Sequence, residues 1–162
     1  MKALVLGGAV SGSAAVHLLK QLDGEVIVYD ERRSAVEKLA AAERVEVSAG
    51  EWDDALLDDV DVVVASPGFA PDSAPIRAAE AAGVPVWNEV ELALRQIDAD
   101  IVAVTGTNGK TTVVELTTAM LREAGMVVTA AGNIGNALSD VALDEWDVIV
   151  LEVSSFQLAR IE

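Results

Sequence analysis

The chain has 162 residues, which is enough for one ordinary domain or for two small ones. Hydrophobic residues make up 52% of it and aromatic residues only 4%, so its core must be built mainly from Val, Leu, Ile and Ala. The net charge of −16 argues against nucleic acid and anionic membranes as general partners. The chain has no cysteine, which excludes a disulfide framework or a thiolate metal site and is compatible with the cytoplasm.

Short apolar runs alternate with helical patterns along the whole chain. In chain order, the sequence predicts strands at 2–6, 25–30, 44–48, 61–66, 84–87, 100–106, 126–131 and 147–152. The helices predicted between them lie at 11–22, 34–42, 73–83, 88–97 and 109–124, with a short one after GNIGN at 132–136. This alternation is typical of parallel sheets with right-handed crossovers, and the expected fold class is therefore α/β.

The start of the chain could imitate a secretion signal, because a lysine is followed by an apolar stretch and small residues. Glycine and serine interrupt that stretch at 7–13, and a strand–helix–strand rhythm continues after it. No run reaches the ~18 apolar residues that a membrane-spanning helix needs. We therefore expect a soluble protein.

Each half of the chain begins with its own strand, glycine-rich loop and helix. Such a unit supplies one ligand crevice at the carboxyl ends of its strands. We therefore predict a Rossmann-like parallel-sheet domain at 1–97 and the first part of a P-loop-type ATPase α/β domain at 98–162.

The loop TGTNGKTT at 105–112 joins an apolar run to a helical pattern. Gly106 and Gly109 allow the backbone to curl with its N–H groups inward, at a helix start that favours negative charge. Lys110 adds an ammonium for the outer phosphates, and the Thr111 hydroxyl is placed to bind Mg²⁺. The alternative is a tight strand-to-helix turn that contains a lysine, since one glycine of the general P-loop pattern is missing.

A magnesium site needs a second hard oxygen ligand. The strand at 147–152 is apolar until Glu152 at its carboxyl end, where a carboxylate can face a ligand crevice. Ser154 and Ser155 follow and could offer hydroxyls. The alternative for Glu152 is a solvated acid at the end of a strand.

The first loop, GGAVSG at 7–12, follows a strand and opens a helix, but Ala9 stands where the dinucleotide fingerprint has a glycine. Asp30 ends the second strand, where an acid often meets a ribose hydroxyl, and Arg32 and Arg33 could pair with a phosphate. This pattern indicates a nucleotide-like ligand or, alternatively, a structural turn. Ser66, Pro67 and Gly68 would face the same crevice, although the sequence alone favours a plain proline–glycine turn there.

Several other polar and aromatic features have a structural explanation. We expect His17 to be a surface or hydrogen-bonded helix residue, and Trp52, Trp87 and Trp146 to pack rather than to stack on a ligand. The acidic stretch at 51–61 is interpreted as a solvated surface.

Three motifs of the second half, preceded by the GGAVSG loop, resemble those of the Mur ligase family. They are TGTNGKTT at 105–112, GNIGN at 132–136 and LEVSSFQL at 151–158. The shortened loop is this family's own form of the P-loop. The SSFQL ending and the ASPG segment at 65–68 are most similar to the members that add D-glutamate.

The resemblance implies an ATP- and Mg²⁺-dependent ligase of peptidoglycan biosynthesis. Its substrates would be UDP-N-acetylmuramoyl-L-alanine and D-glutamate. The γ-phosphoryl group of ATP would pass to the alanyl carboxylate, and the amino group of D-glutamate would attack the acyl phosphate to give an amide, ADP and phosphate. The resemblance also implies a cytoplasmic protein that is a monomer at full length.

The resemblance also implies roles for individual residues. The ATP phosphates would be held by Gly106, Thr107, Asn108, Gly109, Lys110, Thr111 and Thr112. Lys110 and Glu152 would act in catalysis, and Thr111 and Glu152 would bind the metal. The UDP part of the substrate would be held by Val10, Ser11, Gly12, Asp30, Arg32 and Gly68, and Asn133 and Ser154 would reach the substrate between the domains. Glu31 stands where the family often has a hydroxyl residue, and this puts one UDP contact in doubt.

Members of the family are much longer than this chain. We therefore expect residues 98–162 to form an incomplete domain with an exposed strand edge, and the chain alone to be inactive as a ligase. A non-catalytic module that binds a nucleotide or a UDP-sugar, and another member of the family, are alternatives. A nicotinamide-dependent oxidoreductase domain is a further one, but it leaves TGTNGKTT unexplained.

Overall fold

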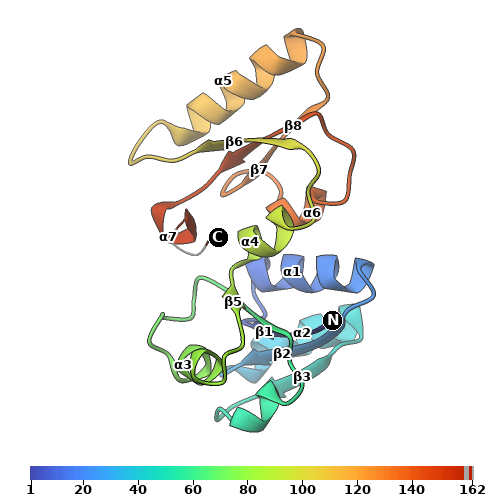
Figure 1. The fold of residues 1–162 in the computed structure, drawn as a ribbon, viewed down its shortest axis with the longest axis vertical. Coiled ribbons are helices and arrows are strands. Elements are labelled where there is room, and N and C mark those ends of the chain that lie inside the picture. Colours follow the sequence, from blue (N-terminus) through green and yellow to red (C-terminus); the bar gives the residue numbers. More distant parts are fainter. Residues whose placement is uncertain (159–160, 162) are drawn as a thin grey trace.

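A computed structural model describes residues 1–158 and 161, and it contains two parallel sheets (Figure 1). The first sheet has the strand order β3-β2-β1-β4-β5. Its strands are β1 (Lys2–Leu6), β2 (Glu25–Asp30), β3 (Glu46–Ala49), β4 (Val62–Ala65) and β5 (Val86–Trp87). The helices that accompany it are α1 (Val10–Gln21), α2 (Arg33–Glu43), the 3₁₀ helix η1 (Asp54–Leu57) and α3 (Ala74–Ala81).

The second sheet has three strands in the order β6-β8-β7. They are β6 (Asp100–Val104), β8 (Val148–Glu152) and β7 (Val128–Gly132). Helix α4 (Glu89–Leu94) follows β5 and precedes this sheet, and the helices that accompany the sheet are α5 (Lys110–Glu123), α6 (Leu138–Val141) and α7 (Ser155–Leu158). All strand pairs are parallel, which confirms the predicted α/β fold class.

Five of the eight strands begin one or two residues later than the sequence predicts. Among them, the third and seventh start at residues 46 and 128 rather than at 44 and 126. Before these two strands the chain turns through a residue with positive φ, 54° at Arg44, the C-cap of α2, and 87° at Gly125, which follows the C-cap of α5. Helix η1 and helix α7 were not predicted.

Alternate residues of the first sheet enter two separate apolar clusters. Val5 packs with α1 on one face, whereas Leu4 and Leu6 pack on the other face with Ile76 of α3. This follows from the strand period of two, and the apolar runs of the sequence bury both faces.

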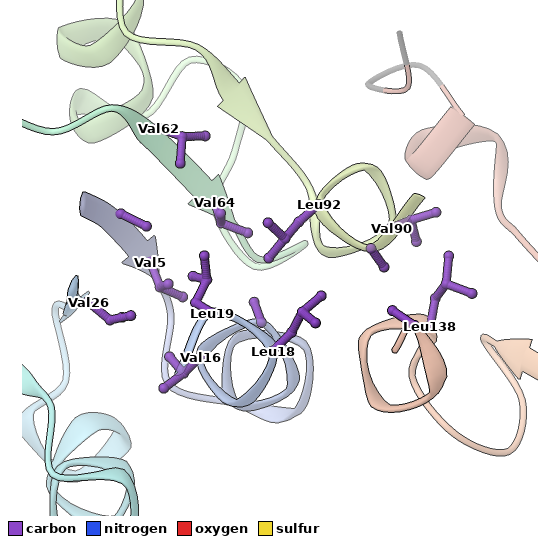
Figure 2. Close-up of a cluster of buried hydrophobic side chains, with 14 of the residues drawn as sticks. Val5, Val16, Leu18, Leu19, Val26, Val62, Val64, Val90, Leu92 and Leu138 are labelled. Atoms are coloured by element: carbon purple, nitrogen blue, oxygen red, sulfur yellow. The ribbon is translucent and has the colours of Figure 1, made fainter. Parts of the chain in front are cut away.

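The apolar core continues from the first sheet into the second through α1, α4 and α6, which pack against one another (Figure 1). Figure 2 shows Leu18 of α1, Val90 and Leu92 of α4, and Leu138 of α6 in this shared cluster. The predicted domain boundary near residue 97 lies between α4 and β6, and it stays a prediction.

The second sheet and its helix α5 leave apolar side chains exposed. Strand β6 forms one edge of it, with Val102 39% exposed. On α5, the outer face carries Val113, Leu116 and Met120, at a helical spacing, and each of them is exposed. Within residues 1–158, no helix combines the length and the apolar composition needed to cross a lipid bilayer.

The tryptophans, the acids of 51–61 and His17 are found in packing contacts or on the surface, as the sequence predicts. Trp52 lies edge-on to Tyr29, the guanidinium of Arg95 lies over Trp87, and the Trp146 indole donates to the Val141 carbonyl. The acids of 51–61 are exposed. His17 lies on the surface of α1, 3.8 Å from the carboxylate of Glu43.

Replacing Gly12 by alanine is expected to destabilise the fold, although alanine favours helix. A Cβ at this position would overlap the Gly7 carbonyl oxygen, so α1 would have to move away from the loop. We expect the free energy of unfolding to fall by about 1–3 kcal/mol in urea denaturation. Gly68→Ala is the control, since nothing lies within 4 Å of its Cβ position. Equal stability of the two variants would contradict this account of Gly12.

Candidate functional site

A cavity of about 610 Å³ lies at the carboxyl ends of β1, β2 and β4. This is the edge of a parallel sheet at which ligands bind. Five of the six residues predicted for the UDP part of the substrate line it, namely Val10, Ser11, Asp30, Arg32 and Gly68. The structure therefore brings together residues that lie up to 58 positions apart in the sequence, from 10 to 68.

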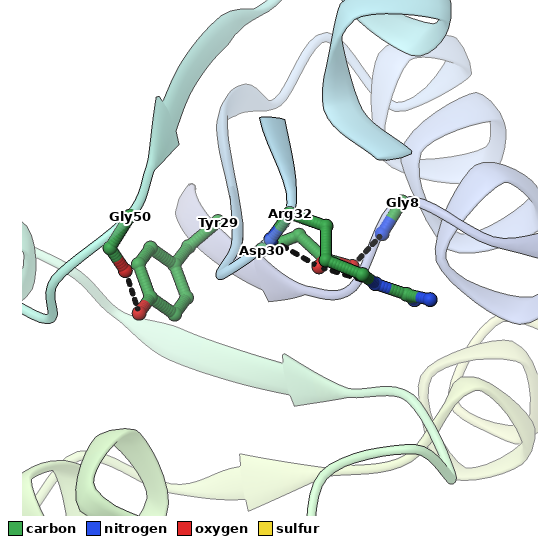
Figure 3. Close-up of polar contacts among 5 residues, drawn as sticks. All are labelled: Gly8, Tyr29, Asp30, Arg32 and Gly50. Atoms are coloured by element: carbon green, nitrogen blue, oxygen red, sulfur yellow. Dashed lines mark hydrogen bonds and ion pairs between the residues drawn. The ribbon is translucent and has the colours of Figure 1, made fainter. Parts of the chain in front are cut away.

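Asp30 holds the first glycine-rich loop in place (Figure 3). One of its carboxylate oxygens accepts from the Gly8 amide at 3.3 Å, and the other accepts from the Arg32 amide at 3.0 Å. The Arg32 guanidinium lies 3.5 Å from the same oxygen, with its side chain 77% exposed. The buried carboxylate is thus occupied by the protein itself, while Arg32 remains accessible to an anion.

Gly12 is buried beneath the loop and does not line the cavity. Its missing side chain allows α1 to approach the Gly7 carbonyl closely. The same holds for Gly8, where a Cβ would lie against the Ala35 carbonyl. The glycines of GGAVSG therefore have a packing function, and a direct ligand contact of Gly12 stays a prediction.

The Ser66–Phe69 segment is both a turn and a wall of the cavity. The Phe69 amide donates to the Ser66 carbonyl at 3.0 Å, which closes the proline–glycine turn. The Phe69 ring extends the apolar side of the cavity, with its centroid 6.2 Å from that of Tyr29.

Tyr29 stiffens the wall behind this cavity. Its hydroxyl donates to the Gly50 carbonyl at 2.8 Å (Figure 3). Burial raises the pKa of this phenol, and the nearby charges of Glu31 and Asp30 raise the pKa further. The hydroxyl therefore stays protonated and keeps its donor role through the physiological range.

Sequence reasoning missed three lining residues, Phe69, Ala70 and Ser73, and gave no ligand role to Ser66. The hydroxyl oxygens of Ser66 and Ser73 are buried and have no hydrogen-bond partner within the described part of the chain. Ser73 stands at the N-cap of α3 without capping it, which no local sequence pattern could reveal.

The second glycine-rich loop lies at the start of α5. Gly106 and Gly109 have φ values of 151° and 77°, in the region that favours glycine, and Gly109 is the N-cap of the helix. The Lys110 ammonium donates to the Gly106 carbonyl at 2.8 Å and so lies over the loop. Thr107, Asn108 and the other residues of the loop are exposed or half-buried, which leaves the loop open to a ligand.

Thr111 at the start of α5 contacts Glu152 at the end of β8, although 41 positions separate them in the sequence. The Thr111 hydroxyl donates to a Glu152 carboxylate oxygen at 2.9 Å. Glu152 is 5% exposed at the carboxyl end of β8, the central strand of its sheet.

This oxygen pair fits a magnesium ion. Two oxygens at neighbouring corners of an octahedron, each about 2.0–2.1 Å from Mg²⁺, lie about 2.9 Å apart. The Thr111 and Glu152 oxygens have that spacing. Among the residues that the structure describes, no group of three or more acids or histidines could hold a metal. The pair therefore suits an ion whose other ligands are phosphates and water.

Asn133 and Ser154 flank Glu152. The backbone N–H of Asn133 donates to the Glu152 backbone carbonyl at 3.0 Å, and Asn133 is exposed. Ser154 and Gln157 form a reciprocal cap of α7, because each side chain accepts from the backbone N–H of the other, at 2.9 and 3.3 Å. The Ser154 hydroxyl also donates to Gln157, so local structure already accounts for this serine, and its substrate contact stays a prediction.

Two family descriptions match the chain. "Mur ligase MurD-like, N-terminal domain" matches residues 1–88, and "Mur ligase middle domain" matches residues 104–162. Together they include both glycine-rich loops, Asp30 and Glu152.

Curated relatives named UDP-N-acetylmuramoylalanine–D-glutamate ligase match nearly the whole chain. That of Halalkalibacterium halodurans is 45% identical over 96% of this chain, and that of Shouchella clausii is 41% identical over 97%. The chain spans only 36% of the length of each.

Solved structures show the same fold at lower identity. UDP-N-acetylmuramate:L-alanyl-γ-D-glutamyl-meso-diaminopimelate ligase of Neisseria meningitides is 19% identical, with a TM-score of 0.58 over 96% of this chain and 54% of that one. UDP-N-acetylmuramate–alanine ligase of Thermotoga maritima is 20% identical, with a TM-score of 0.55 over 95% of this chain and 37% of that one. With one family description covering more than half of its residues, the chain belongs to the Mur ligase family.

Proposed function

We propose that this chain carries the UDP-sugar site and the ATP-phosphate site of a D-glutamate-adding Mur ligase. The reaction of the whole protein would join D-glutamate to UDP-N-acetylmuramoyl-L-alanine in the cytoplasm, for peptidoglycan synthesis. The relatives named UDP-N-acetylmuramoylalanine–D-glutamate ligase support this choice of substrates. Because the chain spans 36% of their length, the joining reaction is proposed for the protein as a whole, and ligand binding for these residues.

The observation that carries the proposal is the arrangement of groups at the N-terminus of α5. Backbone N–H groups, the Lys110 ammonium and the Thr111–Glu152 oxygen pair all lie there. A helix start attracts anions, and the ammonium would exchange the Gly106 carbonyl for phosphate oxygens. A plain turn would use the glycines, but it gives no reason for a buried carboxylate 2.9 Å from the threonine hydroxyl.

The chain's own residues would bind the nucleotide phosphates, orient them and neutralise their charge. The loop would position the phosphates, Lys110 would stabilise negative charge that grows on them, and Thr111 with Glu152 would hold Mg²⁺. When bound, ATP with Mg²⁺ would supply the phosphoryl group that activates the substrate carboxylate. In the first cavity, Arg32 would pair with the diphosphate, while Asp30 keeps the loop closed around it.

Lys110→Ala is expected to weaken ATP binding and to leave UDP-sugar binding unchanged. The lost charge-assisted hydrogen bonds are worth about 1.5–3 kcal/mol, or about 10- to 100-fold in affinity. Calorimetric titration of ATP with and without Mg²⁺ measures the loss of affinity. Glu152→Gln should remove the part of the ATP affinity that depends on Mg²⁺. Lys20→Ala, an exposed lysine on α1, is the control. Equal ATP affinity of Lys110→Ala and the parent chain would reject the phosphate site.

Arg32→Ala is expected to weaken UDP-sugar binding by about tenfold, the effect of one charge-assisted contact, without affecting ATP binding. Arg33→Ala is a matched control, because Arg33 is equally exposed but lies 3.9 Å from Glu37 and does not line the cavity. Fluorescence or calorimetric titration with the UDP-sugar compares the two. If the two variants bind equally well, Arg32 has no diphosphate contact. Tight binding of NADH in place of the UDP-sugar would instead favour an oxidoreductase.

A further inference from the structure

Two adjacent residues at the start of α4, Asn88 and Glu89, connect the first part of the chain to two elements of the second. Helix α4 follows the last strand of the first sheet and lies between α1 and α6 (Figure 1). Both side chains are buried, with 6% and 7% exposed. Neither residue belongs to a predicted ligand site.

Asn88 has two bonding partners in different parts of the molecule. Its carbonyl oxygen accepts from the Glu91 amide at 2.7 Å and caps α4. Its amide group donates to the Gln157 carbonyl in α7 at 2.8 Å. Since Gln157 also caps Ser154, two positions beyond Glu152, the contact reaches the segment that follows the proposed metal ligand.

Glu89 makes the second connection. Its carboxylate accepts from the Ser139 amide of α6 at 2.7 Å, and its backbone carbonyl lies 3.5 Å from the Ser139 hydroxyl. Ser139 is itself buried. The Glu89 carboxylate therefore satisfies an N–H group at the start of α6 that the helix itself cannot satisfy.

The apolar contacts around α4 hold the two parts together without fixing their angle, because burial of apolar surface has no preferred direction. Hydrogen bonds are directional, and an unmade one in a buried place costs about 1–3 kcal/mol. We propose that Asn88 and Glu89 form a two-point latch that fixes the orientation of the first sheet relative to the second. The proposal rests on these contacts alone and is independent of the proposed ligase function.

The charge of Glu89 gives the latch a pH dependence. Burial raises the pKa of this carboxyl above its ordinary value of 4.5, the nearby Asp140 raises the pKa further, and the Ser139 hydrogen bonds partly oppose both. The other charged groups of the packed elements are Glu91 and Arg95, paired at 2.7 Å, and His17 and Lys20 of α1, whereas β4 and β5 have none.

The raised pKa of Glu89 determines the direction in which pH changes the stability of the latch. The closed latch gains most below the ordinary carboxyl pKa, where Glu89 is neutral in every state, and it loses this contribution as the pH rises through the raised pKa. Opening the latch returns an ionised carboxylate to water, so high pH favours a wider range of orientations.

The test measures the distance between the two parts by time-resolved fluorescence energy transfer. The chain has no cysteine, so Lys38→Cys on α2 and Glu115→Cys on α5, both exposed, accept dyes selectively. The latch variants are Asn88→Ser, which keeps a capping oxygen but is too short to reach Gln157, Glu89→Ala, and Glu89→Gln, which keeps the acceptor and removes the charge. Glu80→Gln on α3, exposed and away from the interface, is the matched control.

In the parent chain and in Glu80→Gln, we expect a distance distribution that broadens as the pH rises above the ordinary carboxyl pKa of 4.5. Glu89→Gln should stay narrow throughout, while Asn88→Ser and Glu89→Ala should be broad throughout. Circular dichroism establishes that each variant is folded. Should Glu89→Ala not fold, the comparison of Glu89→Gln with the parent decides. Distributions that are the same in the parent and the latch variants, or a Glu89→Gln profile that follows the parent, would overturn the latch.

Discussion

Parallel strands that are buried on both faces impose one constraint on this chain: a charged side chain can stand only at the first or the last residue of a strand. Asp30 ends the apolar strand β2, and Glu152 ends β8. Because all strands of a sheet point the same way, these ends gather at one edge, beside the glycine-rich loop that follows β1 or β6. The two acids then differ in what they hold. Asp30 binds the backbone of its own loop, whereas Glu152 binds a threonine hydroxyl and thus presents an oxygen pair.

An acidic protein that binds anions must oppose its own field locally. The chain carries 27 acidic and only 11 basic residues. At α5 the opposing charge comes from the helix start and Lys110, and in the first cavity it comes from Arg32. Both cations contact oxygens of the protein, a carbonyl in one case and the Asp30 carboxylate in the other, so each is already oriented before a ligand arrives. Such contacts reduce the entropy lost on binding.

The elements and the loop chemistry could be predicted from the sequence, because both depend on neighbouring residues. Val-rich runs separated by helical patterns are sufficient for the α/β class, and the strand-end position of Glu152 placed it near Thr111. Functions that depend on distant residues could not be predicted: Gly8 leaves room for the Ala35 carbonyl, and Phe69 lines a cavity with residues of the first loop. Ser154 and Gln157 are an intermediate case: their S-x-x-Q spacing is that of a capping box, but the segment was interpreted only as a family motif, and the helix that it caps was not predicted.

The edge strand β6 and the apolar stripe of α5 have a consequence for how the chain behaves in concentrated solution. An unpaired strand edge is a template for pairing with another molecule, and Leu116 and Met120 are 59% and 64% exposed. The opposing force is long-range repulsion between copies that each carry a charge of −16. Added electrolyte shortens the reach of that repulsion to about 3 Å at 1 M and strengthens apolar contacts at the same time if the salt is a sulfate. Colloidal stability of this chain is thus electrostatic, and it is greatest in dilute buffers well above the isoelectric point.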